Sequence, residues 1–222
     1  GTCSRLLALL TRMTEAGLVS ADSALYFVDD GSRDRTWAII EELAAESSRV
    51  HGIKLSRNRG HQIALLAGLF GAEGEAIVSL DADLQDYIEV MDEMVRRYTE
   101  GFEIVYGVRA SRDVDPAFKR GTAQFFYRLL GAMGVEGIYN HADYRLMSRR
   151  ALEGLLEFSE ENLFLRGIVP LVGFKSAVVT YERHERAAGV SKYPLKKMIN
   201  FAIDGVTSFS VKPLRFIFGA GA

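Results

Sequence analysis

The chain has 222 residues, of which 48% are hydrophobic and 25% are charged, and such a chain is long and apolar enough to bury a core. The formal net charge of −2 gives the chain no overall attraction for nucleic acid, so we expect no nucleic-acid partner. The single cysteine, Cys3, excludes a disulfide within the chain, and no apolar run reaches the roughly 20 residues that a membrane-spanning helix needs.

Helical periodicity begins close to the first residue, with apolar side chains at Leu6, Leu9 and Met13. Further along, short apolar runs alternate with longer amphipathic segments. The apolar runs predict strands over residues 24–29, 52–56, 76–80, 103–107, 144–147 and 177–181. The amphipathic segments predict helices over residues 36–45, 61–70, 88–99, 118–131, 149–156, 163–172 and 195–209. This alternation is typical of an α/β fold, in which helices flank a mostly parallel sheet.

Polar side chains follow the predicted strands directly. Residues 29–32 read DDGS, residues 57–60 read RNRG, and residues 81–83 read DAD; Arg109 and Arg112 follow the fourth predicted strand. In open α/β sheets, ligands bind outside the carboxyl ends of the strands. The sequence therefore predicts a site for a phosphorylated ligand and a cation at this edge.

Asp81 and Asp83 form the candidate metal site. Side chains two residues apart on an extended segment point the same way, so both carboxylates can face one ion. Mg²⁺ and Mn²⁺ prefer such oxygen ligands and complete their shell with water and substrate phosphates. In a chain with 29 acidic residues, the same pair could be solvated loop carboxylates. The position at a strand end, with Gln85 close by, favours the metal site.

The segment from Asp29 to Ser32 has two interpretations. Gly31 permits a positive φ in a tight turn, and Ser32 or Asp34 can cap the helix that begins near residue 36. Capping leaves the adjacent acids Asp29 and Asp30 unexplained. A carboxylate here can accept hydrogen bonds from a ribose or a base edge, so we interpret the segment as part of a nucleotide site.

Three further positions have the following interpretations. Gly60 precedes a predicted helix and would let backbone N–H groups approach a ligand closely. We interpret His61 as a surface or cap residue rather than a metal ligand, because no partner stands at metal-binding spacing. Asp86 and Glu89 have the spacing of a capping box, which favours a helix cap for Asp86.

Residues 183–215 are basic, with seven lysines and arginines against two acids, a net charge of +5 in a chain that is −2 overall. Residues 195–209 place apolar side chains on one helical stripe and Lys196 and Lys197 on the other side. Such a helix either packs on the core with a solvated face or lies on an anionic membrane, where each basic residue contributes about 1 kcal/mol. The apolar run from Phe216 favours the membrane.

Eight short segments carry a family resemblance. They are VDDGS (28–32), NRGHQ (58–62), DADLQD (81–86), YGVR (106–109), FYR (126–128), DYRLMS (143–148), FLRG (164–167) and GVSKY (189–193). In this order they resemble family 2 glycosyltransferases of the dolichyl-phosphate mannose synthase and bactoprenol (undecaprenyl-phosphate) glucosyltransferase type. The resemblance extends over nearly the whole chain and implies a GT-A fold, which is Rossmann-like.

The resemblance also implies roles for individual residues. A nucleotide-diphosphate sugar would be bound by Asp29, Asp30, Ser32, Asn58, Gly60, Asp81 and Ala82. Mg²⁺ or Mn²⁺ would be held by Asp81, Asp83 and Gln85. The acceptor phosphate would contact Arg109, Arg112, Arg120, Arg186, Ser191 and Lys192. The residues expected to carry the reaction are Asp83, Asp143, Arg109, Arg186 and Lys192.

The expected reaction moves glucose from UDP-glucose onto undecaprenyl phosphate at the cytoplasmic face of the cell membrane. Transfer of mannose from GDP-mannose to dolichyl or another polyprenyl phosphate is the alternative within the family. Two remote alternatives are a phosphohydrolase with Asp81 as nucleophile and Asp83 as acid/base, and a nucleotide-sugar-binding module without turnover. A homo-oligomer is compatible with all of them.

The chain departs from the family pattern at three places. The family begins with a central strand ending in Pro-x-Tyr-Asn-Glu, which is absent here, so we expect further residues before Gly1. Tyr87 and Ile88 replace a Pro-Pro pair, and residues 140–143 read NHAD in place of an acidic-x-Gly-Asp loop. We expect a GT-A catalytic domain over residues 1–182. We expect a basic acceptor loop and membrane-proximal amphipathic helix over residues 183–222, leading to transmembrane segments.

Overall fold

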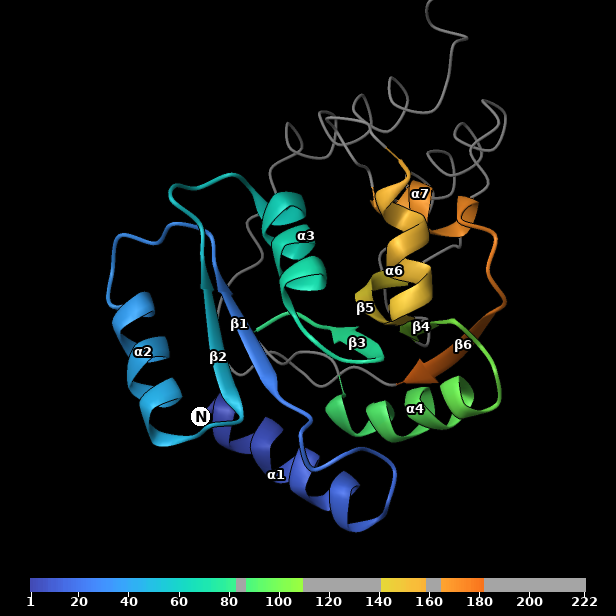
Figure 1. Cartoon of the computed structure of the whole chain (residues 1–222), viewed down its shortest axis with the longest axis horizontal. Helices are drawn as coiled ribbons and strands as arrows, with labels where there is room; N and C mark the ends of the chain where they lie inside the picture. The colour runs from blue at the N-terminus through green and yellow to red at the C-terminus, as the bar shows by residue number, and fades with distance from the viewer. Residues whose placement is uncertain (83–86, 110–140, 159–164, 182–222) are drawn as a thin grey trace, which may run out of the picture.

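The computed structural model describes residues 1–82, 87–109, 141–158 and 165–181. Its helices are α1 (Thr2–Glu15), α2 (Thr36–Glu46), α3 (His61–Gly71), the 3-10 turn η1 (Ile88–Val90), α4 (Met91–Thr99), α6 (Arg149–Leu156) and α7 (Leu165–Leu171). Its strands are β1 (Leu25–Asp29), β2 (Val50–Lys54), β3 (Ala76–Ser79), β4 (Ile104–Arg109), β5 (His141–Ser148) and β6 (Ser176–Tyr181). Figure 1 shows their arrangement.

The predicted elements that fall on described residues are confirmed, with ends shifted by up to three residues. The helix predicted over residues 88–99 is divided into η1 and α4. The helices predicted over residues 118–131 and 195–209, and the cap predicted at Asp86, lie outside the described residues. The boundary at residue 182 and the whole of residues 183–222 lie outside them as well.

The described strands form two sheets. β1 and β2 pair in parallel, and a second sheet has the order β3-β5-β4-β6. β4 and β6 are parallel, whereas β5 runs antiparallel to both β3 and β4. The α/β class is confirmed, and the larger sheet is mixed: of its four described strands, β3, β4 and β6 run in one direction and β5 is reversed. Val108, near the end of β4, pairs with His141 at the start of β5. Because β5 begins beside the end of β4, it must run back in the opposite direction.

The smaller sheet is covered by one helix on each face (Figure 1). A Cβ atom on Gly52 would lie 2.7 Å from a methyl group of Ile40, which places β2 directly against α2. On the other face, Cβ atoms on Gly68 and Gly71 would meet Val28 and Ile53 at 2.9 and 2.8 Å. These glycines on α3 let the helix backbone pack close to the strands, and α3 thereby joins the smaller sheet to the larger one.

The larger sheet has an apolar layer on each face. In Figure 1 it lies between α3, α6 and α7 above and α1 and α4 below. The lower layer includes Met13, Met94 and Leu146, and the upper layer includes Leu69, Met147 and Leu152. Full burial of such a side chain stabilises the fold by about 1.5–3 kcal/mol. Among the helices of the described part of the chain, none is long and apolar enough to cross a membrane.

Candidate functional site

Asp30 joins the end of β1 to the start of α3. Its carboxylate accepts the backbone N–H groups of Arg59, at 2.7 Å, and Gly60, at 2.9 Å. Gly31 makes this approach possible, because a Cβ atom there would lie 2.5 Å from the carbonyl carbon of Arg57. The N–H groups of Arg59 and Gly60, just before α3, are therefore directed at the protein's own carboxylate. Contacts of Asp30 and Gly60 with a nucleotide stay a prediction.

Asp29 has a carboxylate oxygen with unused hydrogen-bonding capacity. The side chain is only 2% exposed, and its Oδ1 accepts the backbone N–H of Ser32 at 3.1 Å. Its Oδ2 is buried and accepts no hydrogen bond from the described residues. A buried carboxylate oxygen without a donor is costly, so a ligand N–H or O–H group could bind here favourably. Asp34 accepts the N–H of Thr36, the first residue of α2, at 2.9 Å, although the N-cap position itself is Arg35, which makes no side-chain cap hydrogen bond.

Asp143 lies at the start of β5 with both carboxylate oxygens engaged. Oδ1 accepts a hydrogen bond from Arg145 at 2.7 Å, and Oδ2 lies 2.9 Å from Nε2 of His61 on α3. Asp143 is 6% exposed and Arg145 is fully buried, whereas the His61 side chain is 57% exposed. Asp143 and Arg145 share one face of β5 because strand residues alternate between faces. Burial raises the pKa of the neighbouring Tyr106 to about 12, against an opposing effect of Arg145.

The end of β3 lies against the same residues. Ser79 donates its hydroxyl to the carbonyl oxygen of Asp143 at 2.6 Å. Asp81 follows two residues later and is exposed, so its carboxylate is a suitable hard oxygen ligand for Mg²⁺ or Mn²⁺. No group of three His, Cys, Asp or Glu side chains is positioned to hold a metal within the described ranges. Asp83 and Gln85, the other predicted ligands, lie outside those ranges.

The remaining predicted site residues are distributed as follows. Asn58 and Ala82 are exposed, the first before α3 and the second after β3. Arg109 is the last residue of β4 and follows Val108, which pairs with His141 at the start of β5. Arg112, Arg120, Arg186, Ser191 and Lys192 lie outside the described residues. The described part of the predicted site therefore consists of the segments after β1, before α3 and after β3, and the start of β5.

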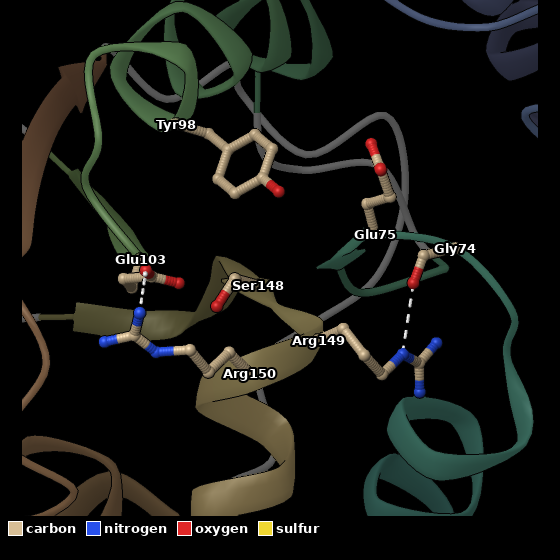
Figure 2. A pocket seen from close by; sticks show the side chains of 7 residues that line it. All are labelled: Gly74, Glu75, Tyr98, Glu103, Ser148, Arg149 and Arg150. Atoms are coloured by element: carbon tan, nitrogen blue, oxygen red, sulfur yellow. Dashed lines mark hydrogen bonds and ion pairs between the residues drawn. The ribbon is translucent and has the colours of Figure 1, made fainter.

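A hollow of about 400 Å³ lies at the other ends of the strands, where β3 and β4 begin (Figure 2). Three of its charged side chains make contacts within the protein. Arg149 donates to the carbonyl oxygens of Ala72 and Gly74, at 2.6 and 3.1 Å. Arg150 lies 3.6 Å from Glu103. The two hydrogen bonds of Arg149 fix the start of α6, so we regard this hollow as structural and separate from the candidate site.

Two members of the site were not identified from the sequence. His61, interpreted as a surface or cap residue, does begin α3, but its ring also contacts Asp143, which is 82 residues away in the chain. Arg145 belongs to a motif used for the resemblance but received no role. The alternation of strand residues could have placed Arg145 on the face of Asp143, whereas no local signal indicates the His61 contact.

Comparison with known proteins defines the family. The sequence model of "Glycosyl transferase family 2" matches residues 9–156, more than half of the chain. The chain belongs to glycosyl transferase family 2. The α/β architecture described above is its GT-A fold, as the resemblance implied.

Two curated relatives of this family member are similar over most of the chain. The uncharacterized glycosyltransferase YkoT of Bacillus subtilis (strain 168) is 54% identical over 217 residues, which are 97% of this chain and 64% of the relative. The bactoprenol glucosyl transferase of Shigella phage SfV is 42% identical over 192 residues, which are 86% of this chain and 62% of the relative. The chain thus spans just under two thirds of the length of these relatives.

Among solved structures, S. aureus TarS (residues 1–349) is similar with a TM-score of 0.47 and 17% identity. The match covers 72% of this chain and 50% of that one. A likeness at this level carries no information about substrates.

Proposed function

We propose that this glycosyltransferase family 2 member moves a hexose from a nucleotide-diphosphate sugar to polyprenyl phosphate, with UDP-glucose and undecaprenyl phosphate as its substrates. The observation that carries the proposal is the chain of contacts that links the end of β1, the start of α3 and the start of β5. Asp30 holds Gly60, and His61 holds Asp143. Asp30, which we expect to bind the nucleotide, and Asp143, which we expect near the reacting carbon, are thereby connected in one region. Relatives named bactoprenol glucosyl transferases support the choice of substrates.

The reaction is a single displacement that inverts the anomeric carbon. An oxygen of the lipid phosphate forms a bond to this carbon while the bond to the nucleotide's diphosphate oxygen breaks, and the nucleoside diphosphate leaves with the electron pair. The second pKa of a phosphate monoester is about 6, so the nucleophile is already anionic at neutral pH. The protein therefore needs no strong general base and contributes positioning and charge stabilisation.

We assign the roles as follows. The buried Oδ2 of Asp29 accepts a hydrogen bond from the nucleoside, and Asp81 holds a divalent metal ion together with Asp83 and Gln85. When bound, this ion would stabilise the negative charge of the leaving diphosphate. Asp143 lies near the reacting carbon. The acceptor phosphate is bound by the basic residues that the resemblance implies, with residues 183–215 directed to the cytoplasmic face of the membrane.

The proposal is tested by incubating the protein with polyprenyl phosphate, Mg²⁺ or Mn²⁺, and a panel of nucleotide sugars. We expect a glycolipid product from UDP-glucose that disappears on addition of EDTA and returns with excess metal. Product from GDP-mannose instead would correct the donor but keep the reaction class. Release of free phosphate without the lipid would indicate a phosphohydrolase, and binding of nucleotide sugar without product would indicate a binding module.

A variant distinguishes loss of the metal site from loss of the folded structure. We expect Asp83→Ala to abolish transfer and leave the unfolding transition in place. The matched control is Asp22→Ala, which removes an exposed carboxylate from the turn before β1 and should keep full activity. Full activity in Asp83→Ala would remove the metal hypothesis.

A further inference from the structure

Asp143 is held from two sides by residues of different character. Arg145, which is fully buried, binds Oδ1 from the same strand, and His61 binds Oδ2 from α3. Rotation of the carboxylate about its last side-chain bond would break both contacts. More than half of the His61 side chain is exposed, so its place is not explained by core packing. The contact between its ring and Asp143 therefore needs an explanation other than core packing.

The position of His61 is itself fixed by the start of α3. Gly60 has a φ of 88°, and its N–H is bound by the carboxylate of Asp30. Gln62, the next residue, accepts the backbone N–H of Leu165 at 3.4 Å, which ties the first turn of α3 to α7. A side chain on an anchored helix start delivers its hydrogen bond with little freedom. The Asp143 carboxylate is therefore oriented from the β1 side of the molecule as well as from β5.

We propose that His61 is a positioning residue for Asp143 in the transfer reaction; this inference rests on the proposed function. His61 acts through the hydrogen bond between its Nε2 and Oδ2 of Asp143, which keeps the carboxylate in the orientation required at the reacting carbon. It does not need to touch the substrate. Because a small displacement of a reacting group can cost about 100-fold in rate, loss of this contact should reduce turnover more than binding.

The test compares His61→Ala with His61→Gln. The amide nitrogen of glutamine can donate from about the position of the histidine Nε2, whereas alanine has no donor. We expect kcat to fall about 10- to 100-fold in His61→Ala, with KM for the nucleotide sugar within about threefold of wild type. His61→Gln should recover kcat to within about fivefold. The control is His51→Gln, because His51 stacks on Tyr26 at the distant end of the strands and should leave both constants unchanged.

Two kinetic results would overturn the inference. In the first, His61→Ala retains the wild-type kcat. In the second, His61→Gln is as slow as His61→Ala, which would mean that the ring rather than its hydrogen bond is needed.

A second measurement separates this inference from the proposed function. If the wild-type protein yields no glycolipid, the proposed function fails, and ¹⁵N NMR of the histidine rings in the ligand-free protein then decides on the contact. We expect Asp143→Asn to shift the ring nitrogen signals of His61 and to leave those of His51 in place. Unchanged His61 signals, in a variant whose backbone spectrum shows a folded chain, would contradict the contact and with it the positioning role.

Discussion

The hydroxyl of Ser79 donates to the backbone carbonyl of Asp143 at 2.6 Å, at the end of the ladder between β3 and β5. Both residues are buried. We predict that Ser79→Ala lowers the free energy of unfolding by about 1–2 kcal/mol, because the buried carbonyl loses this donor. The measurement is urea denaturation. Ser4→Ala, at an exposed position of α1, should change stability by less than about 0.5 kcal/mol. Equal effects of the two substitutions would contradict the prediction.

Gly31 and Gly17 have almost the same backbone conformation in different surroundings. Their φ angles are 67° and 68°, but a Cβ atom on Gly31 would lie 2.5 Å from the backbone of Arg57, whereas one on Gly17 would meet nothing within 4 Å. Gly17→Ala should therefore cost only the positive φ, about 1 kcal/mol. Gly31→Ala should cost about 1–3 kcal/mol more, because backbone atoms must move apart.

Thermal or urea unfolding of the two glycine variants measures the difference. We also expect Gly31→Ala to weaken nucleotide binding, since the same displacement separates Asp30 from Gly60. Similar losses of stability in both variants would show that the close approach at Gly31 carries no cost.

The pair formed by Asp143 and Arg145 should show strong coupling. Removing one member of a buried ion pair leaves an uncompensated charge and costs about 3–5 kcal/mol. We predict a loss of this size in Arg145→Met, and a smaller loss in the double variant Asp143→Asn/Arg145→Met than the two single losses together. A double-mutant cycle in urea measures the coupling. Arg150→Met, which removes an exposed arginine 3.6 Å from Glu103, is the control and should change stability by less than about 0.5 kcal/mol.

Tyr106 should make the protein sensitive to alkali. Burial raises its pKa to about 12, whereas an unfolded tyrosine titrates near pH 10. Since the folded state holds the proton more tightly, this contribution to stability is present below about pH 10 and is lost as the pH rises towards about 12. The rise of the Tyr106 pKa from about 10 to about 12 corresponds to about 3 kcal/mol of stability. Unfolding free energies measured across this range should fall with pH, and the slope should be smaller in Tyr106→Phe.

The slope, rather than the absolute stability, is the quantity to compare, because Tyr106→Phe also removes a hydroxyl from the core. An unchanged slope in Tyr106→Phe would assign the alkaline transition to other groups.

Local patterns were sufficient to place the elements. Apolar runs identified all six described strands, and helix spacing identified α3 and α6 to within one residue. The hydrogen bond of Asp34 at the start of α2 also follows from neighbours in the chain, because the N–H of Thr36 is two residues away. Such interactions are decided within a few residues, so periodicity and spacing contain the information.

Strand direction and pairing could not be obtained in this way. An apolar run reads the same whether a strand is parallel or antiparallel, so the reversed direction of β5 became visible only in the pairing of Val108 with His141. The role of Asp30 is similar. Its sequence position indicates a ligand contact, but its oxygens bind N–H groups 29 and 30 residues away.

The sequence by itself determined the fold class, the order of the motifs and the family, because each depends on residue types at fixed spacing along the chain. Only the tertiary structure decided that His61 faces Asp143 and that Arg145 is buried beside it. The physical reason is that a hydrogen bond requires two atoms within about 3 Å. For residues on different elements, that distance is set by how α3 packs on the sheet, which no local pattern specifies.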